Sequence, residues 1–149
     1  MREFSRSMPM LLLRSREPFL RHFRPSLRAH GVTEQQWRVL RALNAVYEIE
    51  ITALANATCL LAPSLSRILR DLEERELVER RMDNKDLRKS FVSLTQQGLA
   101  LLESFSAESE AIYNGIRERF GQDKYNLLMN LLRDLEASLA VDDVVESEN

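Results

Sequence analysis

The most regular spacing of apolar residues along the chain lies between positions 61 and 75. At 100° per residue the apolar positions share about 100° of arc, and they are Leu61, Leu65, Ile68, Leu69 and Leu72. The polar residues on the opposite side and its flanks are Ser64, Ser66, Arg67 and Arg70. Pro63 suits the first turn of a helix. The pattern predicts a helix at about 62–75 with one side in a core and a polar side rich in arginine and hydroxyl groups.

Upstream, apolar residues keep roughly helical spacing from Pro9 to Leu27. Pro18 and Pro25 each remove a backbone hydrogen-bond donor, so we expect a bent or interrupted helix there. Gly31 suits the end of that segment, because glycine adopts the left-handed conformation that often terminates helices.

A capping box opens the next helix. Thr33 precedes Gln36 by three residues, the spacing at which the two side chains cap the first backbone amides reciprocally. This helix carries "WRVLRAL" and is expected to end near Ala45. A short extended piece at 48–50, a helix of small residues at 51–57 and a turn at 58–61 follow.

Two segments after position 76 alternate like strands, at about 77–82 and 89–94. In the second, Val92 and Leu94 share one face. Thr95 suits the cap of a long helix that extends to about Phe120, and Gly121 separates it from a last helix that ends near Ala140.

This order of elements predicts a mainly α fold with a small β-hairpin wing, a winged helix-turn-helix. The helices at both chain ends are too apolar for the surface of a monomer, and they would find partners in each other across a two-fold axis. We therefore expect a dimerisation lobe from residues 6–30 and 96–140. The winged helix-turn-helix lobe would take residues 31–95, and residues 141–149 would form an acidic, disordered tail.

The net charge of −2 hides an uneven distribution. Residues 1–41 hold nine Lys and Arg against three Asp and Glu, whereas residues 91–149 hold four against eleven. A local basic region can bind phosphate although the total is negative.

Several classes of protein are disfavoured. No apolar run is long enough for a membrane span. A single cysteine, Cys59, argues against a disulfide scaffold and fits a reducing cytoplasm, so we expect a cytoplasmic protein. We find no phosphate loop, no nucleophile–base pair and no metal-ligand spacing around His22 or His30, and therefore expect no catalytic residue, metal or cofactor.

Three stretches resemble the MarR family of bacterial regulators: "GVTEQQWRVLRAL", "LAPSLSRILRDLEERELVER" and "DNKDLRKSFVSLT". The resemblance covers about residues 6–140, and its most specific element is Asp83-x-x-Asp86-x-Arg88. The stretch "RSREPFLRHFRPSLRAHG" is similar to regulators of homoprotocatechuate and hydroxyphenylacetate catabolism. The resemblance implies a homodimeric repressor that binds double-stranded DNA at an inverted repeat and is released by a small aromatic carboxylate.

One position departs from the family pattern. The family usually has glycine between the recognition helix and the following strand, and this chain has Glu76 there. If the position requires a positive φ, the departure costs about 1 kcal/mol.

Short polar groups and arginines on a helix suit the major groove, which predicts DNA contacts from Ser64, Ser66, Arg67 and Arg70. In the wing, Asp83 would cap the turn, and Asp86 would hold the hairpin or orient Arg88. Arg88 would enter the minor groove, while Lys85, Lys89 and Arg80 or Arg81 would contact phosphates. The alternative is an ordinary solvated helix face and loop.

A second cluster combines aromatic rings with arginine. Arg16, Phe19 and Phe23 follow helical spacing, and Trp37 and Arg41 are four residues apart on the next helix. Rings and a guanidinium suit an aromatic carboxylate. The resemblance adds Tyr113, Ser7 from the other subunit, and Glu34 or His22 at a ring hydroxyl. The alternative is that the rings belong to the core and that Arg41 pairs with an acidic residue.

Two other functions compete. A redox regulator of the same fold would use Cys59, but the apolar "ATCLLAP" context predicts a buried cysteine with a raised pKa and low reactivity. The other alternative is an interaction module that acts without DNA. An enzyme is disfavoured because the sequence shows no nucleophile–base pair and no metal-ligand cluster.

Overall fold

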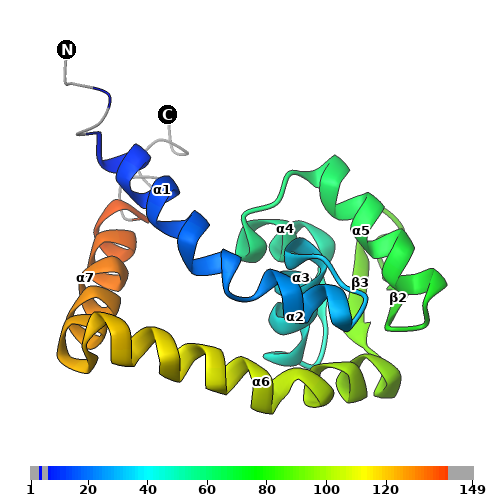
Figure 1. Ribbon diagram of the computed structural model, residues 1–149. Helices are drawn as coiled ribbons and strands as arrows, with labels where there is room; N and C mark the ends of the chain where they lie inside the picture. Colours follow the sequence, from blue (N-terminus) through cyan, green and yellow to red (C-terminus); the bar gives the residue numbers. More distant parts are fainter. Residues whose placement is uncertain (1–3, 5–6, 141–149) are drawn as a thin grey trace, which may run out of the picture. The chain divides into compact units, whose positions relative to one another are not determined.

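A computed structural model describes Phe4 and residues 7–140 (Figure 1). The chain divides into two compact units, the first ending at Ser109 and the second beginning at Glu110. The described residues form helices and one small three-stranded antiparallel sheet, which confirms the predicted winged helix fold class. Arg6, the first residue of the expected dimerisation lobe, and the expected tail at 141–149 lie outside the described residues.

The N-terminal segment is interrupted, as predicted, but only next to the second of its two internal prolines, Pro25. Helix α1 (Met8–Arg21) contains Pro18, and helix α2 (Arg24–Ala29) carries its proline in the first turn. Gly31 follows with a φ of 70° and ends the segment. Leu27 of α2 is buried, whereas α1 contains no buried residue.

The predicted capping box is present at the start of helix α3 (Glu34–Asn44). The Thr33 hydroxyl accepts from the Gln36 amide at 3.1 Å, and the Gln36 side chain accepts from the Thr33 amide at 2.9 Å. The buried side of α3 is Val39, Leu40 and Leu43, the centre of the core of the first unit.

Helices α4 (Ile51–Thr58) and α5 (Ala62–Glu74) form the helix-turn-helix. The predicted apolar stripe of α5 is its buried side: Leu65, Leu69 and Leu72 are fully buried, and Ile68 nearly so. Only Leu61, at the N-cap, is exposed. Burial of that stripe fixes which face of α5 is turned to solvent.

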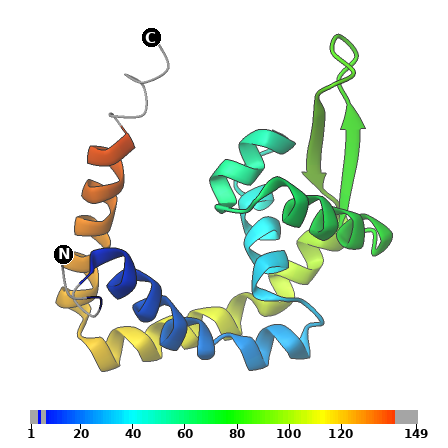
Figure 2. The same cartoon turned by 90° about the horizontal axis from the view of Figure 1, so that it is seen from above.

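Three strands make the sheet: β1 (Ile49–Glu50), β2 (Val78–Met82) and β3 (Ser90–Leu94). Their order is β1-β3-β2 and both pairs are antiparallel. In Figure 2 the β2–β3 hairpin projects beyond the helices of the first unit as the wing. Val78 and Val92 are buried and tie its base to the core.

At the junction between α5 and β2, Glu76 adopts the positive φ at which the family pattern has glycine. Glu76 has a φ of 57°, so a non-glycine residue occupies the left-handed region here. The Leu77 amide then donates to the Leu72 carbonyl at 2.9 Å, which closes the helix end. The expected cost of about 1 kcal/mol therefore applies to this chain.

Helix α6 (Gln96–Phe120) begins in the first unit, where Thr95 caps it by accepting from the Gly98 amide at 3.0 Å. A Cβ at Gly98 would lie 2.1 Å from the Leu77 carbonyl oxygen, so this turn accepts only glycine without a shift. Gly121, with a φ of 99°, ends α6 before helix α7 (Gln122–Ala140). No residue of α7 is buried, and its exposed leucines are Leu127, Leu128, Leu131, Leu132 and Leu139.

Candidate nucleic-acid interface

The solvent side of α5 carries free polar groups. Ser66, Arg67 and Arg70 are exposed and Ser64 is half-buried. None of these four side chains forms a hydrogen bond or ion pair with another residue in the described part of the chain. Two guanidinium groups and two hydroxyls are therefore available to an external partner, on a helix whose orientation is fixed by its buried leucines.

The wing loop closes without glycine, by side-chain and backbone hydrogen bonds. Asp83 Oδ1 accepts from the Lys85 amide at 2.8 Å, which confirms the predicted cap. The Asp83 amide donates to the Lys89 carbonyl at 3.0 Å, and the Lys89 amide to the Asp86 carbonyl at 2.9 Å. Both lysines are exposed at the loop.

Arg88 is held in place although it is almost fully exposed. Asp86 Oδ1 accepts from both the backbone amide and Nε of Arg88 at 3.0 Å, and Oδ2 accepts from Nη2 at 3.2 Å. The side chain of Arg88 is nevertheless 91% exposed. Hydrogen bonds from the Arg88 side chain and backbone lower the pKa of Asp86. As predicted, the carboxylate orients this guanidinium at the tip of the wing.

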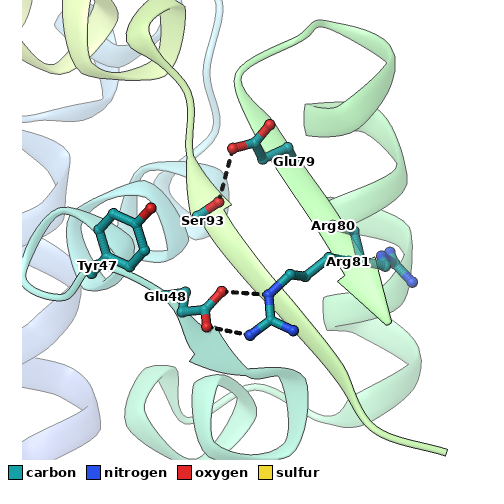
Figure 3. Close-up of a pocket in the computed structure, with 6 residues that line it drawn as sticks. All are labelled: Tyr47, Glu48, Glu79, Arg80, Arg81 and Ser93. Carbon is teal, nitrogen blue, oxygen red and sulfur yellow. Dashed lines mark hydrogen bonds and ion pairs between the residues drawn. The ribbon is translucent and has the colours of Figure 1, made fainter. Parts of the chain in front are cut away.

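Arg81, a candidate phosphate contact, is already paired in this structure. Its Nε donates to Glu48 Oε2 at 2.8 Å, its Nη2 donates to Oε1, and its guanidinium lies 4.6 Å from the centre of the Phe91 ring. Hydrogen bonding to Arg81 lowers the pKa of Glu48. These groups border a surface hollow of about 370 Å³, lined by Tyr47, Glu48, Glu79, Arg80, Arg81 and Ser93 (Figure 3).

The structure brings some of the candidate effector residues together. Arg16 Nη2 donates to Glu34 Oε1 at 2.9 Å and so joins α1 to α3. Phe19 and Phe23 stack with their ring centres 5.7 Å apart, and Phe23 is buried in the core. Ser7 is the half-buried N-cap of α1.

Other candidate effector residues have different surroundings. Trp37 packs edge-on against Phe105 of α6, with ring centres 4.5 Å apart. Arg41 is exposed and has no ion pair among the residues the structure covers, so the alternative that it pairs with an acidic residue is not observed. Tyr113 belongs to the second unit, where the Arg117 guanidinium lies 5.7 Å from its ring centre.

Comparison with known proteins decides the family. The family model described as MarR family matches residues 32–90. The homoprotocatechuate degradative operon repressor of Escherichia coli is 37% identical over 131 residues, which are 88% of this chain and 88% of the repressor. The chain belongs to the MarR family.

Two solved structures support the assignment of this chain to the MarR family. The transcriptional regulator PA4135 is 43% identical with a TM-score of 0.86, over 88% of this chain and 96% of that one. NadR in complex with 4-hydroxyphenylacetate is 37% identical with a TM-score of 0.77, over 94% and 96%. MarR regulators bind DNA and dimerise. This MarR chain is therefore a DNA-binding transcriptional regulator.

The expectation of a buried cysteine in this MarR chain is wrong. Cys59 is exposed. It is the C-cap of α4 and has a φ of 52°, the left-handed conformation that ends the helix. The turn directs this residue to solvent, although its sequence neighbours are apolar.

The part of the chain that the structure describes lacks two other kinds of feature. Within Phe4 and residues 7–140, no group of three or more His, Cys, Asp and Glu side chains is arranged to hold a metal ion. None of the helices described there is both long and apolar enough to cross a membrane.

Sequence reasoning missed three partners. Glu48, Glu73 and Phe105 contact candidate residues but were not assigned to a site. Phe105 was expected among the apolar contacts of the long helix and is buried, but its contact with Trp37 was not predicted. The two glutamates carry no local signal, because their arginine partners are distant in the sequence or on another element.

Proposed function

We propose that this protein represses an operon for the catabolism of an aromatic compound, binds an inverted-repeat operator as a homodimer, and is released by a small aromatic acid. The observation that carries the DNA part is the combination of unpaired polar groups on α5 with the oriented Arg88 at the wing tip. The names of two relatives support the rest. One is a homoprotocatechuate degradative operon repressor, and the other was solved with 4-hydroxyphenylacetate.

The proposed DNA contacts follow the chemistry of each group. On α5, Arg67 and Arg70 read guanine edges or phosphates in the major groove, and Ser64 and Ser66 add short-range hydrogen bonds. Arg88 enters the minor groove, where narrow A·T tracts concentrate negative potential. Lys85 and Lys89 lie on phosphates. A two-fold dimer reads two half-sites about one helical turn apart.

Fluorescence anisotropy with the DNA upstream of the gene tests this part. Wild-type protein is expected to bind, with an affinity that falls steeply with salt because phosphate contacts release counterions. Arg88→Ala should weaken binding by about tenfold or more at fixed salt. Lys124→Ala, which also removes one exposed positive charge, serves as the control and should bind like wild type. Unchanged affinity of Arg88→Ala would refute the wing contact.

The proposed dimer uses the apolar surfaces of residues 6–30 and 96–140, and leaves residues 31–95 to DNA. Its support is that neither α1 nor α7 buries any residue, although both carry exposed leucines. Leu131→Glu should shift sedimentation equilibrium toward monomer and lower operator affinity together. A wild-type protein that sediments as a monomer at micromolar concentration would contradict the proposal.

The proposed effector site combines Ser7, Arg16, Phe19, Phe23, Glu34, Trp37, Arg41 and Tyr113. Among its arginines, Arg16 is bound to Glu34, whereas Arg41 is exposed and forms no ion pair within the described residues. Arg41 is therefore the guanidinium best able to receive a carboxylate, with Trp37 one turn away on the same helix. A bound ligand shifts the dimer toward the conformation that it binds more tightly, and the difference between its affinities for the two conformations sets the size of the shift.

Calorimetry with hydroxyphenylacetate, homoprotocatechuate and salicylate tests the effector. At least one should release heat on binding and dissociate the operator complex. Arg41→Gln should abolish both effects and leave operator affinity without ligand unchanged. Arg28→Gln, exposed on α2, is the charge-matched control. If none of the three acids releases heat or dissociates DNA, the aromatic-acid part fails while the DNA part stands.

A redox-sensing regulator is the second candidate function, because Cys59 is exposed rather than buried. It predicts that peroxide releases the operator complex and that Cys59→Ser abolishes the release. A wild-type complex that is insensitive to peroxide excludes this candidate.

A further inference from the structure

Two consecutive arginines of β2 reach in opposite directions to carboxylates of different elements. Side chains alternate between the two faces of a strand, so Arg80 and Arg81 leave β2 on opposite faces. Arg80 binds Glu73 of α5. Arg81 binds Glu48, which precedes β1.

The Arg81 side chain crosses the neighbouring strand. Because the strand order is β1-β3-β2, β3 lies between Arg81 and the segment that carries Glu48. Figure 3 shows Arg81 extending over β3 to the Glu48 carboxylate. On the way its guanidinium stacks on Phe91, its cross-strand partner in the register, at 4.6 Å. Two hydrogen bonds and a ring fix both the position and the plane of the guanidinium.

Arg80 makes the corresponding contact on the opposite face of β2. Its Nη2 donates to Glu73 Oε2 at 3.0 Å, and each of the two side chains is 33% exposed. Glu73 lies in the last turn of α5. This ion pair therefore connects the wing strand directly to the helix whose other side faces solvent.

The backbone alone gives the wing little support. β2 is an edge strand that pairs only with β3, and β1 pairs with β3 through just two residues, Ile49 and Glu50. Beyond the pair Met82 and Ser90, the two arms of the hairpin are joined by the hydrogen bond from the Asp83 amide to the Lys89 carbonyl, and the strand pairing ends there. Small rotations at its base would displace the wing tip, so contacts from side chains at the base decide where Arg88 lies.

We propose that the Arg80–Glu73 and Arg81–Glu48 pairs form a brace that holds the wing from both faces and positions Arg88, and that neither arginine contacts phosphate. We call this set of four residues the wing brace. The proposal rests on the proposed contact of Arg88 with DNA. Exposed ion pairs add little to global stability, so the effect of the brace lies in the geometry of the wing.

The rival role for these arginines is direct phosphate binding, and it predicts the opposite sign. If Glu48 only neutralised Arg81, then Glu48→Gln would free a guanidinium, add a positive charge and tighten DNA binding. For the wing brace, the same substitution loosens the wing and weakens DNA binding despite the added charge.

The first experiment compares operator affinities of charge-matched variants. Glu48→Gln and Glu73→Gln should each weaken binding about threefold to fivefold, and the double variant should weaken it further. Glu79→Gln is the matched control: it lies on the same face of β2 as Arg81, but among the described residues its carboxylate accepts a hydrogen bond only from the Ser93 hydroxyl of the same hairpin, at 3.3 Å. It should bind as tightly as wild type or slightly more tightly. Tighter binding by Glu48→Gln overturns the proposal.

The salt dependence of binding separates positioning from phosphate contact. Loss of one phosphate contact reduces the slope of log affinity against log salt by about 0.9. Lys89→Gln should show that reduction, whereas Arg81→Gln should lose affinity with an unchanged slope. The charge-swapped pair Glu48→Arg with Arg81→Glu should recover part of the lost affinity. A slope reduced by about one in Arg81→Gln overturns the proposal.

A double-mutant cycle with Arg88 tests whether the brace acts through the wing tip. Arg88→Ala should cost much less affinity in the Glu48→Gln, Glu73→Gln background than in wild type. Amide hydrogen exchange of free protein should become faster in β2 and β3 of the double variant, while urea denaturation shows a folded protein. Unchanged exchange refutes the brace. Faster exchange with no effect of Arg88→Ala in any background refutes the DNA contact instead, so the two failures are distinguishable.

Discussion

Helix α5 and the wing are both proposed to contact DNA, but different forces hold them. The helix buries four apolar side chains against the core of the first unit, and its DNA-facing groups make no bonds to other described residues. The wing buries only Val78 and Val92 at its base, and beyond the backbone pairing of β2 with β3 its side-chain contacts are polar: the loop bonds of Asp83 and Asp86 and the ion pairs of the proposed wing brace. Hydrophobic packing thus orients one contact, and hydrogen-bonded ion pairs orient the other.

This difference separates stability from recognition. Removing apolar atoms from α5 should unfold the protein, because a cavity in the core destabilises it by several kcal/mol. Removing a charge from the wing should leave the fold almost intact, because exposed pairs contribute little, and should change DNA binding through geometry.

The largest expected effect is in the packed helix. Leu69 is fully buried, so Leu69→Ala should lower the free energy of unfolding by about 2–5 kcal/mol in urea denaturation. Leu61→Ala is the control, because Leu61 is 77% exposed at the N-cap of the same helix, and it should change stability by less than about 0.5 kcal/mol. Equal losses in the two variants would mean that burial does not hold α5.

The next effect lies in the wing loop. Asp86→Ala removes the acceptor that orients Arg88, and operator affinity should fall about fivefold relative to Asp83→Asn, while the midpoint of urea denaturation stays within error of wild type. The two variants lose the same charge, but the asparagine introduced by Asp83→Asn retains a side-chain oxygen that can accept from the Lys85 amide. A large loss of stability in Asp86→Ala would show that contacts in the wing, like those in the core, contribute strongly to the free energy of unfolding.

A smaller effect is expected at the junction that joins the two regions. Glu76→Gly should raise the free energy of unfolding by about 0.5–1 kcal/mol, because glycine adopts a φ of 57° without steric cost. Glu74→Gly, at the last residue of α5, should instead lower it by a smaller amount. Thermal and urea unfolding of both variants measure the difference. A destabilised Glu76→Gly would indicate that the glutamate side chain stabilises the turn.

The smallest effect concerns pH. Arg88 lowers the folded-state pKa of Asp86 below its ordinary value of 3.8, so the contribution of this pair is complete above that value. It is lost only as the pH falls through the depressed folded pKa. Orientation of Arg88 should therefore be constant between about pH 5 and 8. Carboxyl NMR titration should place the Asp86 midpoint below 3.8 in wild type and closer to it in Arg88→Ala.

Features whose partners are near in the sequence were predictable. The Thr33–Gln36 box and the Asp83 cap depend on residues at most a few positions away, and both are present. The family pattern raised the question of a positive φ at Glu76, and the structure has one there. The apolar stripe of α5 was predictable for the same reason, because one helical period determines it.

Contacts between distant segments were not predictable. Arg81 and Glu48 are 33 residues apart, and Arg16 and Glu34 are 18 apart, so their pairing depends on how the elements pack. Local composition also misled where backbone conformation decides exposure. The apolar neighbours of Cys59 suggested burial, but the left-handed turn at that residue exposes it.

The adjacent positions of Arg80 and Arg81 also bear on how the hairpin selects its alignment during folding. A slip of β2 by one residue against β3 would move every side chain of β2 to the other face. Val78 would leave the core, and each arginine would be separated from its carboxylate. A misaligned hairpin therefore loses apolar burial and both ion pairs at once. The hairpin loop has no glycine turn to fix the register of the two strands. The charged residues at the base of the wing therefore help to select the native register.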